Sequence, residues 1–169
     1  MDALEAIKGR RSVRKYKEES VADEQVKQIL EAGQRAATKG NKQPWKFIIL
    51  DDAQVRNDLA DTLSTGKFLS DAPLGIAVVV KPDDPIHALQ DGAAATQNML
   101  LAAHALGLGA CWISVYDMAW EEEAKRTLGI PEQERFLSVI SVGHPAEIPQ
   151  KEKKTLEEIT FINRYGLRS

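Results

Sequence analysis

The sequence predicts an α+β protein, an α/β sandwich in which helices flank a central β-sheet. Short apolar runs rich in β-branched residues, of which Leu74–Val80 is the clearest, are typical of buried strands. The segments between these runs repeat apolar residues at helical spacing, and interleaved strands and helices form layers around one sheet. The 169 residues suffice for one domain with a real core.

Each element follows from a local pattern. Strands are predicted where an apolar run is bounded by turn residues, over 45–50, 74–80, 110–115 and 136–142. Helices are predicted from apolar residues at helical spacing, over 4–9, 23–36, 55–63, 84–106 and 118–128. The segment 10–16 reads as extended, 38–44 as a polar loop, and 156–165 as a final segment after a charged linker.

The helix over 84–106 has the most unusual composition. Asp84 is expected at its N-cap and Pro85 at its first position. The helix is apolar on nearly every side, so it must be covered on every side. The small residues Gly92–Ala95 at its middle suit close packing against another backbone. We therefore expect a subunit interface along this helix.

Composition excludes several classes of protein. Lys and Arg number 22 against 25 Asp and Glu, so the net charge of −3 gives no general attraction to nucleic acid. Cys111 is the single cysteine, which rules out an intrachain disulfide and a thiolate metal cluster. The three histidines lack ligand spacing. We find no signal core and no apolar stretch of membrane-spanning length, and expect a cytoplasmic protein without nucleic-acid or membrane partners.

The first candidate site is the segment Arg10–Arg14. Alternation along an extended chain places Arg10, Ser12 and Arg14 on one face. Two guanidinium groups flanking a hydroxyl suit a phosphate, which they can bind through charge-assisted hydrogen bonds. The alternative is a solvated basic stretch.

The second candidate is the loop 37–45. Asn41 and Gln43 offer amide donors and acceptors that can bind the edge of a planar heterocycle. Gly40 permits an unusual backbone, and Pro44 prevents a helix from continuing. The alternative is a plain connection between helix and strand, with Trp45 in the core.

The third candidate is the segment 107–113. Its glycines, Gly107 and Gly109, would let backbone N–H groups face a ligand without an intervening side chain. They do not form a dinucleotide fingerprint, because they follow a helix and not a strand. The alternative is a glycine that merely ends a helix before a buried strand.

Together these segments resemble the nitroreductase family over nearly the whole chain. The family has an Arg-Arg-Ser-x-Arg opening, an Asn-x-Gln-Pro-Trp loop and a long helix running into Gly-Leu-Gly-x-Cys-Trp-Ile. The chain carries these as Arg10–Arg14, Asn41–Trp45 and Gly107–Ile113. A Val-Gly-x-Pro turn at Val142–Pro145 follows, and then a basic pair near the C-terminal arm, Lys151 and Lys153, so that all the motifs occur in the family's order.

The resemblance implies a mixed central sheet and an intertwined homodimer, in which about 150–169 form an arm on the partner subunit. It also implies FMN as cofactor and NADH or NADPH as co-substrate. The phosphate and ribityl chain would be held by Arg10, Arg11, Ser12, Arg14, Lys151 and Lys153. The flavin ring would contact Asn41, Gln43 and the backbone of Trp112, Ile113 and Ser114. The partner's flavin would be reached by Ala37, Thr38 and Lys39.

Three positions depart from the family pattern. Ala37 replaces the usual proline, and Lys153 stands where arginine is common, which keeps the charge but loses the bidentate fork. His144 occupies a position where an aromatic residue is frequent.

The sequence thus predicts an FMN-dependent oxidoreductase that transfers hydride from NAD(P)H to a small electron-poor acceptor such as a nitroaromatic or quinone. No catalytic side chain is assigned, because the flavin carries the redox chemistry. The alternatives are a protein of the same fold with another task, such as flavin breakdown or reductive dehalogenation, and a non-enzymatic flavin-binding regulator. A thiol enzyme using Cys111 is a further rival, although no obvious base accompanies this residue.

Overall fold

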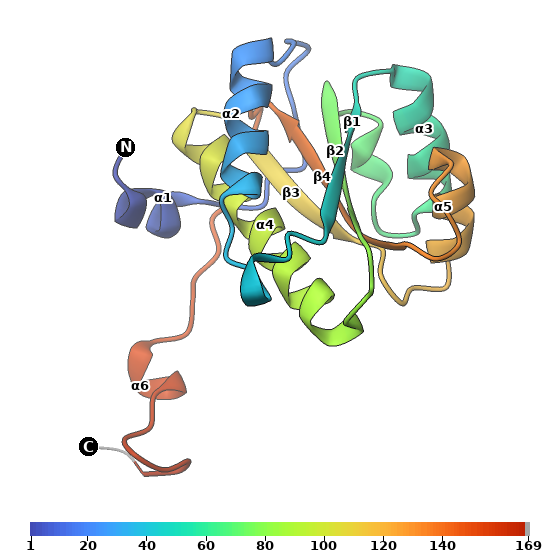
Figure 1. The fold of residues 1–169 in the computed structure, drawn as a ribbon. Helices are drawn as coiled ribbons and strands as arrows, with labels where there is room; N and C mark the ends of the chain where they lie inside the picture. The colour runs from blue at the N-terminus through green and yellow to red at the C-terminus, as the bar shows by residue number, and fades with distance from the viewer. Residues whose placement is uncertain (168–169) are drawn as a thin grey trace.

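The computed structural model describes residues 1–167 (Figure 1). Its helices are α1 (Ala3–Gly9), α2 (Asp23–Gln34), α3 (Ala53–Thr62), α4 (Pro85–Ala105), α5 (Glu121–Leu128) and α6 (Leu156–Ile159). Its strands are β1 (Trp45–Leu50), β2 (Leu74–Val80), β3 (Gly109–Ser114) and β4 (Arg135–Gly143). Two short 3₁₀ turns, η1 (Lys39–Asn41) and η2 (Lys67–Leu69), lie in connections. The α+β class is confirmed.

The sheet formed by the described residues has the strand order β1-β2-β4-β3. Each neighbouring pair is antiparallel, so the expectation of a mixed sheet is wrong for these strands. The long helix α4 carries the chain from β2 to β3, which run in the same direction, but β4 inserts between them. Every direct pairing is therefore antiparallel. A parallel pairing occurs at the isolated bridge between Ser12 and Ala110.

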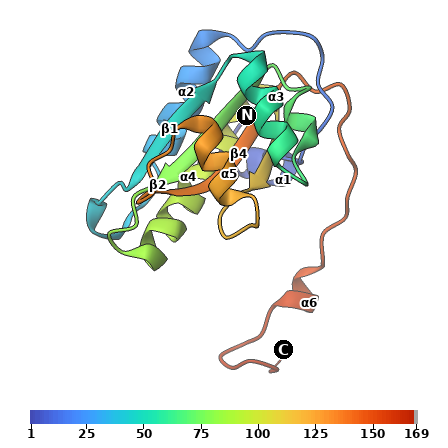
Figure 2. The same cartoon turned by 90° about the vertical axis from the view of Figure 1, so that its right-hand side faces the viewer.

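Helices cover both faces of the sheet, as the two orthogonal views show (Figures 1 and 2). Successive side chains of a strand point to opposite faces. Ile76 and Val78 of β2 pack with residues of α2 and α4, whereas Ala77 and Val79 pack with residues of α3 and α5. Because both faces are buried, β2 is apolar throughout, which is why its bounds could be predicted from the sequence.

The small residues of α4 face a different neighbour from the one expected. A Cβ atom added at Gly92 would lie 2.6 Å from Val80 Cγ1 and 2.7 Å from Leu137 Cδ2. Ala95 is also fully buried. Gly92 therefore lets α4 approach the chain's own sheet, and this contact, not one with another subunit, accounts for the glycine at this position.

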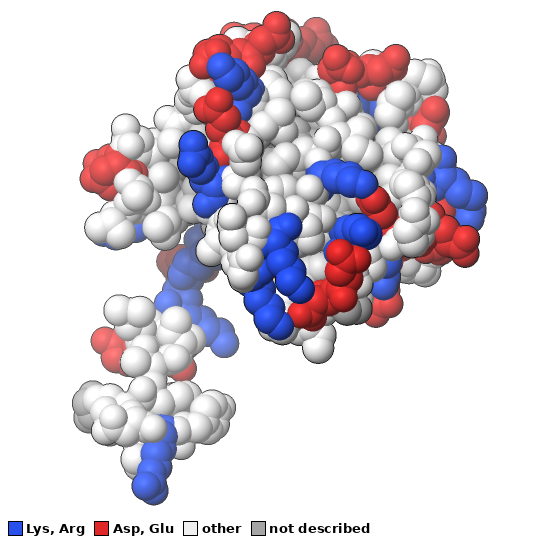
Figure 3. Space-filling model, viewed as in Figure 1, with Lys and Arg blue, Asp and Glu red and all other residues white. Residues whose placement is uncertain are grey.

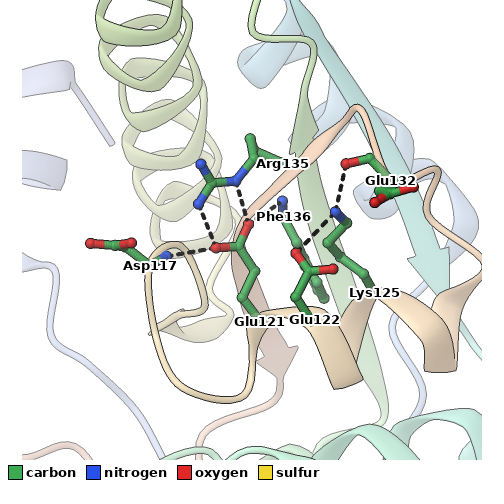
Figure 4. A network of polar contacts seen from close by, with 7 residues as sticks. All are labelled: Asp117, Glu121, Glu122, Lys125, Glu132, Arg135 and Phe136. Atoms are coloured by element: carbon green, nitrogen blue, oxygen red, sulfur yellow. Dashed lines mark hydrogen bonds and ion pairs between the residues drawn. The ribbon is translucent and has the colours of Figure 1, made fainter.

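Helix α5 begins at Glu121, three residues after the predicted start at Met118, and a polar network explains the difference (Figure 4). The Glu121 carboxylate accepts two hydrogen bonds from the Arg135 guanidinium, at 2.8 and 2.7 Å. It also accepts the backbone N–H groups of Asp117 at 2.7 Å and Phe136 at 3.2 Å. The carboxylate thus fixes the turn after β3 against the start of β4, and the helix can begin only beyond that turn.

The C-terminal segment leaves the body of the protein (Figures 1 and 2). Large apolar side chains along it are exposed, including Leu156, Ile159, Ile162 and Tyr165. The described part of the predicted arm, 150–167, contains the single helical turn α6. In the described part of the chain, no helix combines the length and apolar character needed to cross a membrane.

Candidate functional site

The segment Arg10–Arg14 runs along the edge of the sheet at β3. Val13 donates its backbone N–H to the carbonyl of Ala110 at 3.0 Å, and its side chain is buried. A Cβ at Gly109 would lie 2.7 Å from Val13 Cβ, so only glycine allows this close approach. The glycine before β3 therefore serves to seat the basic segment.

Arg10, Ser12 and Arg14 all influence Cys111 on the neighbouring strand β3. Burial raises the pKa of the Cys111 thiol, while the charge of Arg14, a hydrogen bond from Ser12 and the charge of Arg10 act to lower it. Burial prevails, and a thiol with a raised pKa is a poor nucleophile at neutral pH. Cys111 is thus a buried, protonated residue and not an activated one.

Arg14 is exposed on the outer side of this segment. Its guanidinium carbon lies 5.6 Å from the centre of the Phe68 ring, and one of its nitrogens donates to the Ser12 carbonyl at 3.3 Å. These weak contacts orient the group without neutralising it, because within residues 1–167 no acidic side chain forms an ion pair with Arg14. Its charge remains available to an anion.

Arg11 lies on another side and meets the start of the arm. Together with Lys151 and Lys153 it lines a cavity of about 570 Å³, which Gln150 and Glu152 complete. Basic side chains gather where the arm leaves the body (Figure 3). Cations 140 residues apart in the sequence therefore share one cavity, and their chemistry suits an anionic group such as a phosphate.

The loop 37–43 has an unusual backbone. Gly40, Asn41 and Gln43 have positive φ angles of 58°, 58° and 48°. The Gln43 side-chain amide donates to the Asn41 carbonyl and to Asn41 Oδ1, both at 3.2 Å. Thr38 Oγ1 accepts the Gln43 N–H at 3.4 Å. The two amides are thus held together, and they line a polar cavity of about 450 Å³ with Arg35.

Lys39 joins this loop to α4. Its ammonium group lies 3.0 Å from Asp84 Oδ2, and His87 Nδ1 lies 2.8 Å from the same oxygen. Hydrogen bonds from His87 and Lys39 hold the pKa of Asp84 well below its usual range. Asp84 makes no capping hydrogen bond to the backbone of α4, so the expected side-chain cap is replaced by these two contacts.

On β3, the three predicted residues differ in accessibility. Ile113 is buried in the core on one face of the sheet, Trp112 is half-buried against the core on the other face, and Ser114 is exposed. The strand pairs with β4 on one side, and the bridge from Ser12 covers only its beginning. Backbone groups near Ser114 therefore lie on a sheet edge, where they can contact a ligand.

The predicted site residues of the basic segment and those of the loop 37–43 lie at two different places on the protein. Arg11 and Gln43 line separate cavities, so the loop and the basic segment do not enclose one site here. A larger groove of about 800 Å³ lies between α2 and β1, lined by apolar residues such as Val26, Leu30 and Phe47. This groove contains none of the predicted site residues.

Comparison with known proteins identifies the family. A model described as the nitroreductase family matches residues 7–78 and 60–144, which is most of the chain. The chain belongs to the nitroreductase family. A protein from Methanothermobacter thermautotrophicus, named "Putative NADH dehydrogenase/NAD(P)H nitroreductase", is 39% identical over 88% of this chain and 80% of its own length.

Solved structures of nitroreductase-family proteins share the fold. One of the same name from Bacteroides thetaiotaomicron has a TM-score of 0.92 and 33% identity, covering 96% of this chain and 98% of its own. A structure from Desulfovibrio desulfuricans, described as a nitroreductase in complex with FMN, has a TM-score of 0.85 and 33% identity. It covers 98% of both chains.

Sequence reasoning about this nitroreductase-family chain missed the residues that hold the loop. Asp91, on α4, accepts the Lys39 N–H at 3.3 Å through each of its carboxylate oxygens, and it is buried. Arg35 lines the cavity of the Asn41 and Gln43 amides. The one available signal was an acidic residue within an otherwise apolar helix, which indicates a polar contact.

Proposed function

We propose that this chain is an FMN-dependent oxidoreductase, which transfers hydride from NAD(P)H to a small electron-poor acceptor such as a nitroaromatic or quinone. The observation that carries the proposal is the cluster of Arg11, Lys151 and Lys153 around one cavity, in a chain of the nitroreductase family. The phosphate of FMN is close to a dianion, and several cations match its charge. The related structure with bound FMN supports the same assignment.

The chain's own groups would bind and orient the cofactor. Arg10, Ser12 and Arg14 offer donors on one face of the basic segment, and Asn41 and Gln43 offer amides to a ring edge. When bound, the flavin supplies the hydride chemistry. Basic side chains around it would stabilise negative charge on the reduced ring. The edge of β3 near Ser114 would present backbone donors to it.

The functional unit in this proposal is a homodimer in which each site uses both chains. The exposed apolar side chains of the arm support it, because each contributes about 1.5–3 kcal/mol when fully buried. The half-buried outer face of α4, with Ala93 and Leu101, supplies further apolar surface. In this proposal each chain would also bring Ala37, Thr38 and Lys39 to the flavin of its partner.

The decisive experiment identifies the cofactor of the purified protein. We expect a yellow protein that releases FMN and not FAD on denaturation, because the basic groups provide for one phosphate. Chromatography of the released flavin measures this, and anaerobic addition of NADH should bleach the bound flavin. Recovery of FAD, or a protein that takes up no flavin, would contradict the proposal. Stoichiometric loss of flavin in oxygen would favour flavin breakdown instead.

Replacing Arg14 with alanine should weaken FMN binding by about 10- to 100-fold, because a charge-assisted hydrogen bond contributes about 1.5–3 kcal/mol. Fluorescence quenching of free FMN on titration with apoprotein measures the affinity. Lys15→Ala is the matched control, since Lys15 is the exposed neighbour on the other side of the chain and pairs with Glu147. Equal affinity of Arg14→Ala and the parent would exclude Arg14 as a phosphate ligand.

A further inference from the structure

Asp91 is a buried carboxylate that nothing in the family assignment explains. Its exposed fraction is 8%, and in residues 1–167 its hydrogen bonds are those from the Lys39 N–H to its two oxygens. No Lys, Arg or His among the described residues forms an ion pair with it. Burying a carboxylate without a cation costs free energy. An apolar side chain at this position would avoid the free-energy cost of burying a carboxylate, so packing alone does not explain Asp91.

Asp91 occupies a rigid position. The next residue, Gly92, lies so close to Val80 and Leu137 that a Cβ there would clash with both. Ala88, one turn earlier on the same side of α4, is also buried. Helix α4 is thus fixed against the sheet on both sides of Asp91. A carboxylate on such a helix can hold a loop in one place.

The loop that Asp91 contacts needs an external support. Asn41 and Gln43 have positive φ, which costs about 1–3 kcal/mol for each non-glycine residue unless the surroundings impose it. The hydrogen bonds among Thr38, Asn41 and Gln43 are internal to the loop. Among the described residues, its hydrogen bonds to the body run from the Lys39 N–H to Asp91, from the Lys39 ammonium group to Asp84 and His87, and from the Lys81 N–H to the Pro44 carbonyl.

Of these connections, only the one to Asp91 joins a buried side chain to the backbone of the turn itself. The contact between Lys39 and Asp84 is made by exposed or half-buried side chains, so solvent weakens it. The contact at Pro44 lies after the turn, at the start of β1. Asp91 is therefore the buried side chain that anchors the backbone of the turn 39–43 to α4.

We propose that Asp91 is a positioning residue, which holds the Lys39 N–H so that the Asn41 and Gln43 amides keep the orientation that binds the flavin edge. The inference rests on the proposed function, because it takes these amides as flavin contacts. Asp91 itself touches no ligand. Its effect passes through the backbone of Lys39 to the strained turn that follows.

The test compares Asp91→Ala, Asp91→Asn and the control Asp83→Ala. Asp91→Ala removes the acceptor and should weaken FMN binding about tenfold. Asp91→Asn keeps an acceptor oxygen in the same place and should rescue the affinity to within about threefold of the parent. Asp83 is exposed and pairs with Lys81, so its replacement should leave FMN binding unchanged.

Two further measurements separate positioning from general stability. Hydrogen exchange of the segment 37–43 should be faster in apo Asp91→Ala than in the parent or Asp91→Asn. Thermal unfolding of the apoproteins should show no loss for Asp91→Asn, because removing an unpaired buried charge is not destabilising. Asp91→Ser, whose side chain is too short to reach Lys39, takes the place of the alanine variant if that variant does not fold.

The outcomes are distinct. Parent-like FMN affinity in Asp91→Ala, or weakened binding with unchanged exchange at 37–43, would overturn the positioning role. Failure of Asp91→Asn to restore the affinity would also overturn it. A parent protein that binds no FMN would defeat the proposed function instead, and the exchange measurement would still show whether Asp91 anchors the loop.

Discussion

Deleting residues 155–169 should produce a monomer that has lost its FMN. The arm exposes Leu156, Ile159, Ile162 and Tyr165, the last with 93% of its surface accessible. Such a row of apolar side chains is stable in water only when another surface covers it. In the proposed homodimer that surface belongs to the partner, and each flavin site uses both chains. Loss of the arm should therefore abolish dimerisation and cofactor retention together.

Sedimentation velocity at micromolar concentration, recorded at the flavin and protein absorbances, measures both effects at once. The deletion keeps Lys151 and Lys153, so loss of FMN cannot be ascribed to loss of these cations. Glu157→Gln is the control, because it alters an exposed charged side chain of the arm and leaves the apolar ones in place. A full-length protein that sediments as a flavin-loaded monomer would refute the shared site.

Glu121→Gln should lower the free energy of unfolding by about 1.5–3 kcal/mol at pH 7, because the buried carboxylate accepts charge-assisted hydrogen bonds from the partly exposed Arg135 guanidinium. The variant leaves the Arg135 guanidinium without its bidentate partner and weakens the contacts to Asp117 and Phe136 (Figure 4). Urea denaturation of the apoprotein measures the loss. Glu123→Gln is the control, because Glu123 lies two residues further along α5 and is exposed. Its free energy of unfolding should match that of the parent.

The ion pair between Glu121 and Arg135 also predicts how the stability of the protein depends on pH. Burial acts to raise the pKa of Glu121, but the hydrogen bonds from Arg135, Asp117 and Phe136 outweigh it, so the pKa in the folded protein is lowered. The stabilisation is therefore present above the unfolded pKa of about 4.3 and is lost as the pH falls through the lowered folded value. The difference between parent and Glu121→Gln should shrink in acid. A difference that stays constant from pH 7 to pH 3 would contradict this assignment.

The sequence by itself determined the elements whose signal is local. The bounds of β1 and β2 agree with the prediction. For β2 the reason is that a strand buried on both faces is an uninterrupted apolar run, as in Leu74–Val80. The alternation of Arg10, Ser12 and Arg14 was also local, since an extended chain places every second side chain on one face. In the structure all three residues act on the pKa of Cys111.

The contacts between residues distant in the sequence could not be predicted from local patterns. The small residue Gly92 fits either a partner helix or the chain's own sheet, and only the placement of α4 on Val80 and Leu137 selects the sheet. Asp84 is the N-cap residue of α4, as predicted, but its side chain makes no capping hydrogen bond, because it pairs with Lys39 of the loop at 3.0 Å instead. Periodicity fixes which residues share a face, but it does not say what that face meets.

The candidate site shows the same division. Residue types and order indicated a phosphate site and a ring-binding loop, because charge and hydrogen-bonding capacity belong to the side chains themselves. The family resemblance grouped Arg11 with Lys151 and Lys153, and the tertiary structure shows that these three line one cavity. Only the tertiary structure revealed that Asp91 is buried against the Lys39 N–H. The physical reason is that burial and the distance between groups depend on how the elements pack, and these set the strength of every charge in the site.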